Sequence, residues 1–68
     1  MKEYVLSFRE RQVLQFLSEG IERPEIAKRL GLSPFTIKGH IRLAMARLGA
    51  HNITHAVVLA IRKGEINS

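Results

Sequence analysis

The segment Ser33–Leu48, SPFTIKGHIRLAMARL, has the pattern of an amphipathic helix whose outer face is cationic. Ser33 is a residue type that caps the start of a helix, Pro34 suits the first helical position, and Gly49 is a stop. One stripe of this helix, about 22 Å long, carries the apolar residues Ile37, Ile41, Ala44 and Leu48. The opposite face carries Phe35, Lys38, Gly39, Arg42 and Ala46. The stretch has no acidic residue, so one face suits burial and the other suits the major groove of DNA.

The totals predict one small domain over residues 1–68, with its core between about residues 6 and 66. A core of this size is thin, and oligomerisation would stabilise it. The chain has no cysteine, which excludes disulfides and thiolate metal sites. No apolar run approaches the roughly 18 residues that cross a bilayer, and no signal peptide is visible, so we expect a cytoplasmic location.

Charge is distributed unevenly along the chain. The net charge is +5, and no Asp or Glu occurs between Ile26 and Gly64. That span contains the basic residues Lys28, Arg29, Lys38, Arg42, Arg47, Arg62 and Lys63. The balance favours an anionic partner. Nucleic acid is favoured over a membrane, because the span has its own buried stripe and loops, unlike a lone helix lying on a membrane surface.

Two further helices are expected before residue 33. Ser7 and Glu10 form a capping box at the start of a helix that runs to about Glu19 and stops at Gly20. Its expected apolar face is Phe8, Val13, Leu14, Phe16 and Leu17, with Val5 and Leu6 tucked against the core. A shorter helix runs from Pro24, at its first position, to Leu30.

The short helix and the segment 33–48 are separated by Gly31-Leu32-Ser33. Gly31 ends the short helix, and Leu32 is placed for the apolar contact that accompanies a Schellman stop. Two helices joined by such a turn form the helix-turn-helix pattern.

A last helix is expected from Asn52, as cap, through Ile53 to Lys63, ending at Gly64. Its segment AVVLAI is apolar on nearly every side. Ala56, Val57, Ala60 and Ile61 can face the core, which leaves Val58 and Leu59 outward as a homodimer surface. The fold class predicted is therefore all-α, with four helices.

The chain resembles the DNA-binding domain of the LuxR/FixJ/NarL (GerE-like) type from about Leu6 to Ile66. The matching pieces, in order, are LSFRERQVLQFLSEG, PEIAKRLGLSPFTIKGHI, ARLGA and NITHAVVLAIRKGEI. The resemblance implies that the third helix reads the major groove and that the fourth forms a two-fold dimer contact. The family's base-facing positions fall on Lys38, Gly39 and Arg42. Its structural positions fall on Glu10, Leu14, Gly20, Ile26, Ala27, Leu30, Ser33, Thr36, Ile37, Ile41 and Leu48.

Other residues are assigned to the DNA backbone or to the dimer. Arg23, Lys28, Arg29 and Arg47 are expected phosphate contacts, with solvated charge as the alternative. Ser33 and Thr36 either cap the helix only or also meet a phosphate. The expected dimer interface is Val58, Leu59 and Arg62.

Enzyme chemistry has no support in the sequence. The chain contains no Asp and no phosphate-loop glycine pattern, and His51 and His55 lack further ligands for a metal. His40 is interpreted as a boundary packing residue. No cofactor or small-molecule ligand is expected.

The leading interpretation is a sequence-specific transcription regulator that binds double-stranded DNA as a dimer, with RNA polymerase as a further candidate partner. It would be associated with the bacterial nucleoid when bound. The alternatives are a sigma-factor region-4-like promoter-binding domain and a helix-turn-helix protein-interaction module that does not bind DNA. The sequence suits either a whole small regulator or the effector domain of a longer one.

Overall fold

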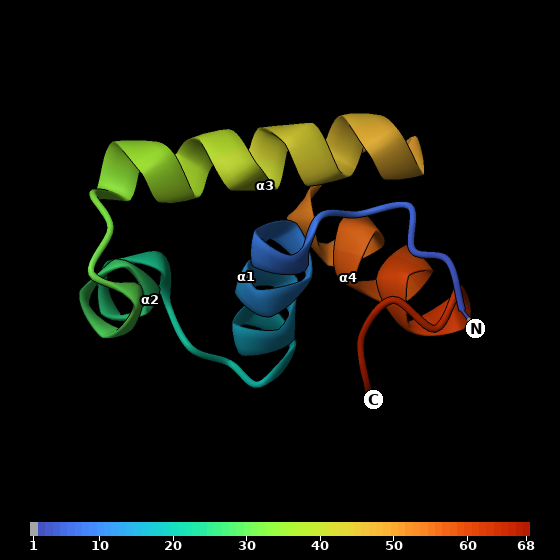
Figure 1. Ribbon diagram of the computed structural model, residues 1–68, viewed down its shortest axis with the longest axis horizontal. Coiled ribbons are helices and arrows are strands. Elements are labelled where there is room, and N and C mark those ends of the chain that lie inside the picture. Colours follow the sequence, from blue (N-terminus) through green and yellow to red (C-terminus); the bar gives the residue numbers. More distant parts are fainter. Residues whose placement is uncertain (1) are drawn as a thin grey trace.

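The computed structural model describes residues 2–68, and the regular secondary structure in that range is α-helical. They are α1 (Phe8–Ser18), α2 (Arg23–Leu30), α3 (Pro34–Leu48) and α4 (Ile53–Arg62). Figure 1 shows α3 lying along one edge of the molecule, across α1, with α2 and α4 on either side of α1. The predicted all-α, four-helix fold is confirmed for the described residues.

Side-chain caps begin three of the helices, as the sequence predicts. At α1 the Ser7 hydroxyl accepts the Glu10 amide at 3.1 Å, and the Glu10 carboxylate accepts the Ser7 amide at 3.0 Å, which completes the capping box. At α3 the Ser33 hydroxyl accepts the Thr36 amide at 3.1 Å. Asn52 caps α4 in the same way. These caps satisfy amides that have no partner inside a helix.

Three helix boundaries differ from the prediction by one residue. Helix α1 ends at Ser18 rather than at about Glu19, which is its cap. Helix α2 begins at Arg23 rather than Pro24, with Glu22 as a cap residue that makes no side-chain bond to the helix. Proline is compatible with the whole first turn, so its presence does not specify the first position. Helix α4 ends at Arg62, and Lys63 is its cap.

The turn between α2 and α3 has the predicted Schellman geometry. Gly31 has a φ of 67°, a left-handed conformation that favours glycine. The Leu32 amide donates to the Ala27 carbonyl at 2.9 Å, and the Gly31 amide donates to the Lys28 carbonyl at 3.3 Å. Because these bonds close the end of α2, the chain turns at once into α3.

Helix α3 joins the two parts of the hydrophobic core. The first cluster links α1, α3 and α4 and contains Leu6, Leu14, Ala44, Leu48, Ala56, Ala60 and Ile66. The second links α1, α2 and α3 and contains Val13, Ile26, Ala27, Ile37 and Ile41. The predicted α3 stripe is confirmed, since all four of its residues are buried. The first half of the stripe, Ile37 and Ile41, packs into the second cluster. The second half, Ala44 and Leu48, packs into the first cluster.

Two expected core residues are exposed instead. Phe8 is 68% exposed and Val5 is 50% exposed, whereas Leu6 is buried as predicted. Phe8 lies on the side of α1 opposite Val13 and Leu14, as a rotation of about 100° per residue requires. The prediction for Phe8 is therefore wrong, because hydrophobicity was counted without regard to its position around the helix.

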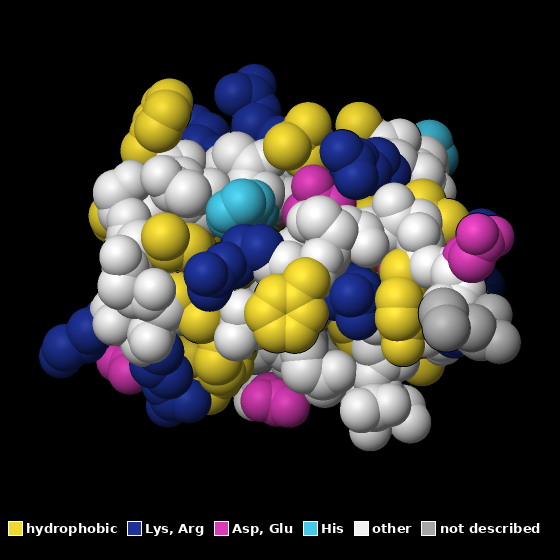
Figure 2. All heavy atoms as spheres, in the orientation of Figure 1, with side chains coloured by type: hydrophobic (Ala, Val, Ile, Leu, Met, Phe, Trp, Pro, Cys, Tyr) yellow, Lys and Arg dark blue, Asp and Glu magenta, His cyan; other side chains and the backbone are white. Residues whose placement is uncertain are grey.

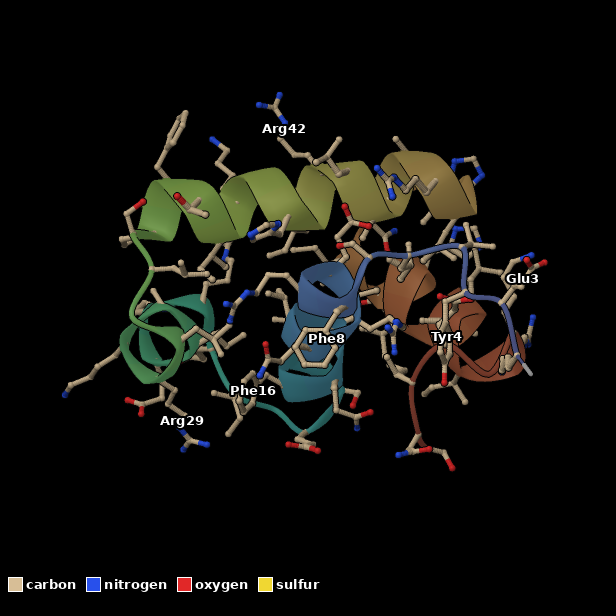
Figure 3. All side chains as sticks on the ribbon, in the orientation of Figure 1. Glu3, Tyr4, Phe8, Phe16, Arg29 and Arg42 are labelled. Carbon is tan, nitrogen blue, oxygen red and sulfur yellow. The ribbon has the colours of Figure 1, made fainter. Side chains whose placement is uncertain are left out.

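Phe8 belongs to a small aromatic and cationic group on the surface. The Arg11 guanidinium carbon lies 3.7 Å from the Tyr4 ring centroid and 5.8 Å from that of Phe8. Figure 3 shows the two rings on the same face of the molecule, at the start of α1 and on the segment before it. Stacking on a guanidinium stabilises exposed rings of this kind.

The outer side of α4 also departs from the prediction. Val58 is 37% exposed, as expected for an outward residue. Leu59 is half-buried and packs against the first core cluster. Leu6 and Ile66 belong to that cluster and lie outside the helices, so the core around α4 is wider than the helix pattern alone indicates.

The two ends of the chain are tied together. The buried carboxylate of Glu65 accepts the amides of Val5 at 2.9 Å and Leu6 at 3.0 Å. The Gln15 side chain exchanges two hydrogen bonds with the backbone of Asn67. Within the part of the chain that the structure describes, no helix has both the length and the apolar character to cross a membrane.

We expect Glu65→Gln to lower the free energy of unfolding by about 1–3 kcal/mol, because the new amide group would face an amide N–H and leave a buried donor unpaired. Urea denaturation measures the change. The exposed Glu3→Gln serves as the control, with an expected change below about 0.5 kcal/mol. Equal midpoints for the two variants would contradict the role of Glu65.

Candidate nucleic-acid interface

The outward face of α3 is exposed and cationic, as predicted. Phe35, Lys38, Arg42 and Ala46 are all exposed, and Gly39 is half-buried. Figure 3 shows Arg42 projecting away from the body of the molecule, and Figure 2 shows Lys and Arg side chains along the same edge. No other described helix covers this face, so a long cylindrical partner can approach it.

An open cleft of about 370 Å³ lies where the first turns of α2 and α3 meet, lined by Arg23, Pro24, Pro34 and Lys38. Arg23 and Pro24 begin α2, and Pro34 begins α3. Two cations and the positive ends of two helix dipoles therefore face one space. The two cations suit a phosphate group.

Ser33 and Thr36 lie at the start of α3. Beyond accepting the Thr36 amide, the Ser33 hydroxyl lies 3.0 Å from the Thr36 hydroxyl. Capping is therefore observed for Ser33. The two hydroxyls flank Pro34, the first residue of α3, which lines the cleft. A phosphate contact by either hydroxyl stays a prediction.

Arg47, an expected phosphate contact, has a partner within the chain. One of its guanidinium nitrogens lies 3.5 Å from the buried carboxylate of Glu10, while half of the Arg47 side chain stays exposed. Glu10 also completes the capping box of α1. Arg47 thus links α3 to α1, and its pairing reduces the positive charge available to DNA at that end of α3.

The two basic residues of α2 differ in their surroundings. Arg29 forms an ion pair with Glu25 at 3.0 Å and lies over the Phe16 ring at 5.7 Å. In Figure 3 it projects from the side of α2 that faces away from α3. The structure therefore separates Arg29 from the α3 face. Lys28 is exposed and has no ion pair among the described residues.

Gly39 occupies the middle of α3 with a helical backbone. An added Cβ would meet nothing within 4 Å, so packing inside this chain does not require glycine there. Glycine in a helix interior costs about 1 kcal/mol relative to alanine. An open, destabilising glycine on the outward face is typical of a position where another molecule approaches the backbone closely.

The residues assigned to the dimer lie on α4. Val58 and Arg62 are exposed, and Leu59 is half-buried as described above. Elsewhere on α4, His55 accepts the His51 amide through Nδ1 at 3.0 Å, and the two rings stack at 5.1 Å. This pair closes the turn before α4. His40 is half-buried, which agrees with its interpretation as a boundary residue.

The model of the luxR family of bacterial regulatory proteins matches residues 4–60. This chain belongs to that family. The transcriptional activator protein BjaR1 of Bradyrhizobium diazoefficiens is 44% identical over 62 residues, which are 91% of this chain and 26% of BjaR1. The spore germination protein GerE of Bacillus subtilis is 39% identical over 91% of this chain and 84% of GerE. The resemblance inferred from the sequence motifs is confirmed.

The fold agrees with that assignment. A solved structure of the transcription factor GerE superposes with a TM-score of 0.91 at 28% identity, covering 96% of this chain and 97% of that one. The transcriptional regulatory protein FixJ of B. diazoefficiens is 37% identical, and the match covers 30% of it. The chain thus spans about a quarter of BjaR1 but most of GerE.

Sequence reasoning did not find three features of the structure. It missed the Arg47–Glu10 ion pair, the Arg11–Tyr4 stack and the shared cleft of Arg23 and Lys38. Each joins residues from different segments, so no local pattern reports it. The capping box did mark Glu10 as a residue with a structural role.

We expect Gly39→Ala to raise the free energy of unfolding by roughly 0.5–1 kcal/mol, since the site has room for a methyl group. The same change should weaken binding to a selected DNA site and leave binding to random duplex unchanged. Thermal unfolding and fluorescence anisotropy measure the two effects. The reverse change on the same face, Ala46→Gly, should destabilise the chain by a similar amount. If Gly39→Ala gained stability but bound the selected DNA site unchanged, a close approach of DNA to the Gly39 backbone would be contradicted.

Proposed function

We propose that this chain is a DNA-binding transcription regulator of the LuxR/GerE type that inserts α3 into the major groove. The observation that carries the proposal is that the outward face of α3 is exposed and cationic. The chain around it has no acidic residue between Ile26 and Gly64. Family membership supports the same interpretation. Binding rather than catalysis is the inferred activity, and the cytoplasm is the inferred location.

The dimensions of α3 suit this placement. A helix of 15 residues is about 22 Å long. The major groove is about 12 Å wide and admits one such helix. In this placement the α2–α3 cleft lies at the groove edge, where a phosphate of the DNA backbone is available.

We assign distinct roles to the cations. Lys38 and Arg42 project from the outward face and would contact base edges, with Gly39 between them allowing close approach. Arginine pairs with guanine O6 and N7 together, so Arg42 is assigned to a guanine. Arg23 and Lys28 would contact phosphates and supply affinity without sequence preference.

A homodimer on a two-fold site completes the proposal. Val58 and Arg62 are the exposed α4 residues that would meet a second copy, with Leu59 at the edge of the contact. The two α3 helices would then occupy half-sites about one helical turn apart. Selection of bound duplexes from a random pool tests this arrangement, because it reports symmetry and spacing. A single unrepeated half-site would contradict the dimer.

The base-reading role predicts a selective defect for Arg42→Ala. Affinity for the selected site should fall about 5- to 150-fold per half-site, because a good side chain–base pair is worth roughly 1–3 kcal/mol. Affinity for random duplex should fall much less. The matched control is Arg29→Ala, which removes the same charge on the far side of α2. If Arg42→Ala lost the same affinity for both duplexes, Arg42 would be assigned to the DNA sugar-phosphate backbone instead of a base.

A phosphate contact predicts a change in salt dependence. For Arg23→Ala the slope of log K against log salt concentration should become shallower by about 1 per half-site, with equal weakening on all sequences. Arg9→Ala on α1, where Arg9 bonds to Gln12, is the control and should leave the slope unchanged. Titrations at several salt concentrations measure both. An unchanged slope for Arg23→Ala would remove the α2–α3 cleft from the interface.

A further inference from the structure

Phe35 lies on the outward face of α3, and neither the core clusters nor the assigned DNA contacts account for it. It is 84% exposed, more than any other large hydrophobic side chain among the described residues. The exposed Phe8 is partly covered by the Arg11 guanidinium, but Phe35 has no aromatic or cation–π partner in the described part of the chain. Covering a ring this exposed is favourable, so a partner that buried it would gain affinity.

Helical spacing puts Phe35 on the centre line of the DNA-facing surface. Phe35, Gly39, Arg42 and Ala46 follow one another at intervals of four, three and four residues, opposite the buried stripe. Phe35 and Arg42 are separated by two turns, or about 10 Å along the axis. That distance corresponds to about three base-pair steps along a duplex.

The charges around Phe35 limit what can cover it. Lys38 and Arg42 share its face, and Lys38 also lines the α2–α3 cleft. A partner must therefore be anionic and also present an apolar group to the ring. In the major groove of DNA that apolar group is the C5 methyl of thymine.

We propose that Phe35 is a specificity-determining residue that packs on a thymine methyl group in the major groove. The inference rests on the proposed placement of α3 and adds a base preference to it. Phe35 would specify a thymine about three base pairs from the position that Arg42 contacts. Gly39, where a Cβ would meet nothing within 4 Å, leaves space beside the ring for the edge of the base pair.

The test removes only the methyl group. The probe is the duplex selected from a random pool by the wild-type chain, with each thymine of the half-site replaced in turn by deoxyuridine, which pairs identically. For the wild type we expect one position where the replacement weakens binding about fourfold per half-site, the value of one buried methyl group. For Phe35→Ala we expect weaker binding to the thymine duplex and no further loss with deoxyuridine.

Two variants complete the experiment. Phe35→Leu should keep part of the methyl sensitivity, because its side chain is still apolar. Phe8→Ala removes an exposed ring from α1 and should change neither the affinity nor the sensitivity. Because both rings are exposed, each variant is expected to fold.

The outcomes separate this inference from the proposed function. Methyl sensitivity that persists in Phe35→Ala, or a selected half-site with no thymine near the Arg42 contact, would overturn the role of Phe35 alone. Equal weakening of Phe35→Ala on all duplexes would assign the ring to the sugar-phosphate backbone and also overturn it. Failure to select any sequence would overturn the proposed function itself, and this inference with it.

Discussion

The packing of one stripe of α3 into two core clusters is the constraint on which the rest of this structure depends. Ile37 and Ile41 pack with α1 and α2, and Ala44 and Leu48 pack with α1 and α4. This stripe fixes the rotation of α3 about its own axis. Because side chains on a helix are rigidly spaced, fixing the buried stripe also fixes which residues point outward. The direction of Arg42 is thus a consequence of hydrophobic packing on the opposite side of the helix.

Ion pairs within the chain separate the basic residues into those already paired with a glutamate and those available to a partner. Arg29 and Arg47 each pair with a glutamate. Arg29 pairs within α2, and Arg47 on α3 pairs with a glutamate of α1. Arg23, Lys38 and Arg42 are exposed and have no ion pair among the described residues. Net charge alone does not report this division. The pairing concentrates positive potential on the first half of α3 and the start of α2, where the cleft is also found.

The same face carries two features that lower the stability of the isolated chain. Gly39 weakens the helix, and Phe35 exposes a large ring to water. Neither has a compensating contact within the described residues. Local departures from the most stable choice are common where a protein meets its ligand. Their position on the centre line of the outward face agrees with a role in binding, whereas Phe8 has a partner in Arg11.

The sequence by itself determined the four helices, the side-chain caps of three of them, the α2–α3 turn and the two faces of α3, because spacing and capping are local properties that each segment carries alone. It misplaced Val5, Phe8 and Leu59, since exposure depends on which neighbouring segment covers a side chain. Only the tertiary structure decided that Glu10 pairs with Arg47, that Glu65 holds the first residues of the chain, and that Arg23 and Lys38 share a cleft. Those contacts join residues that are distant in the sequence, and their geometry follows from how the helices pack.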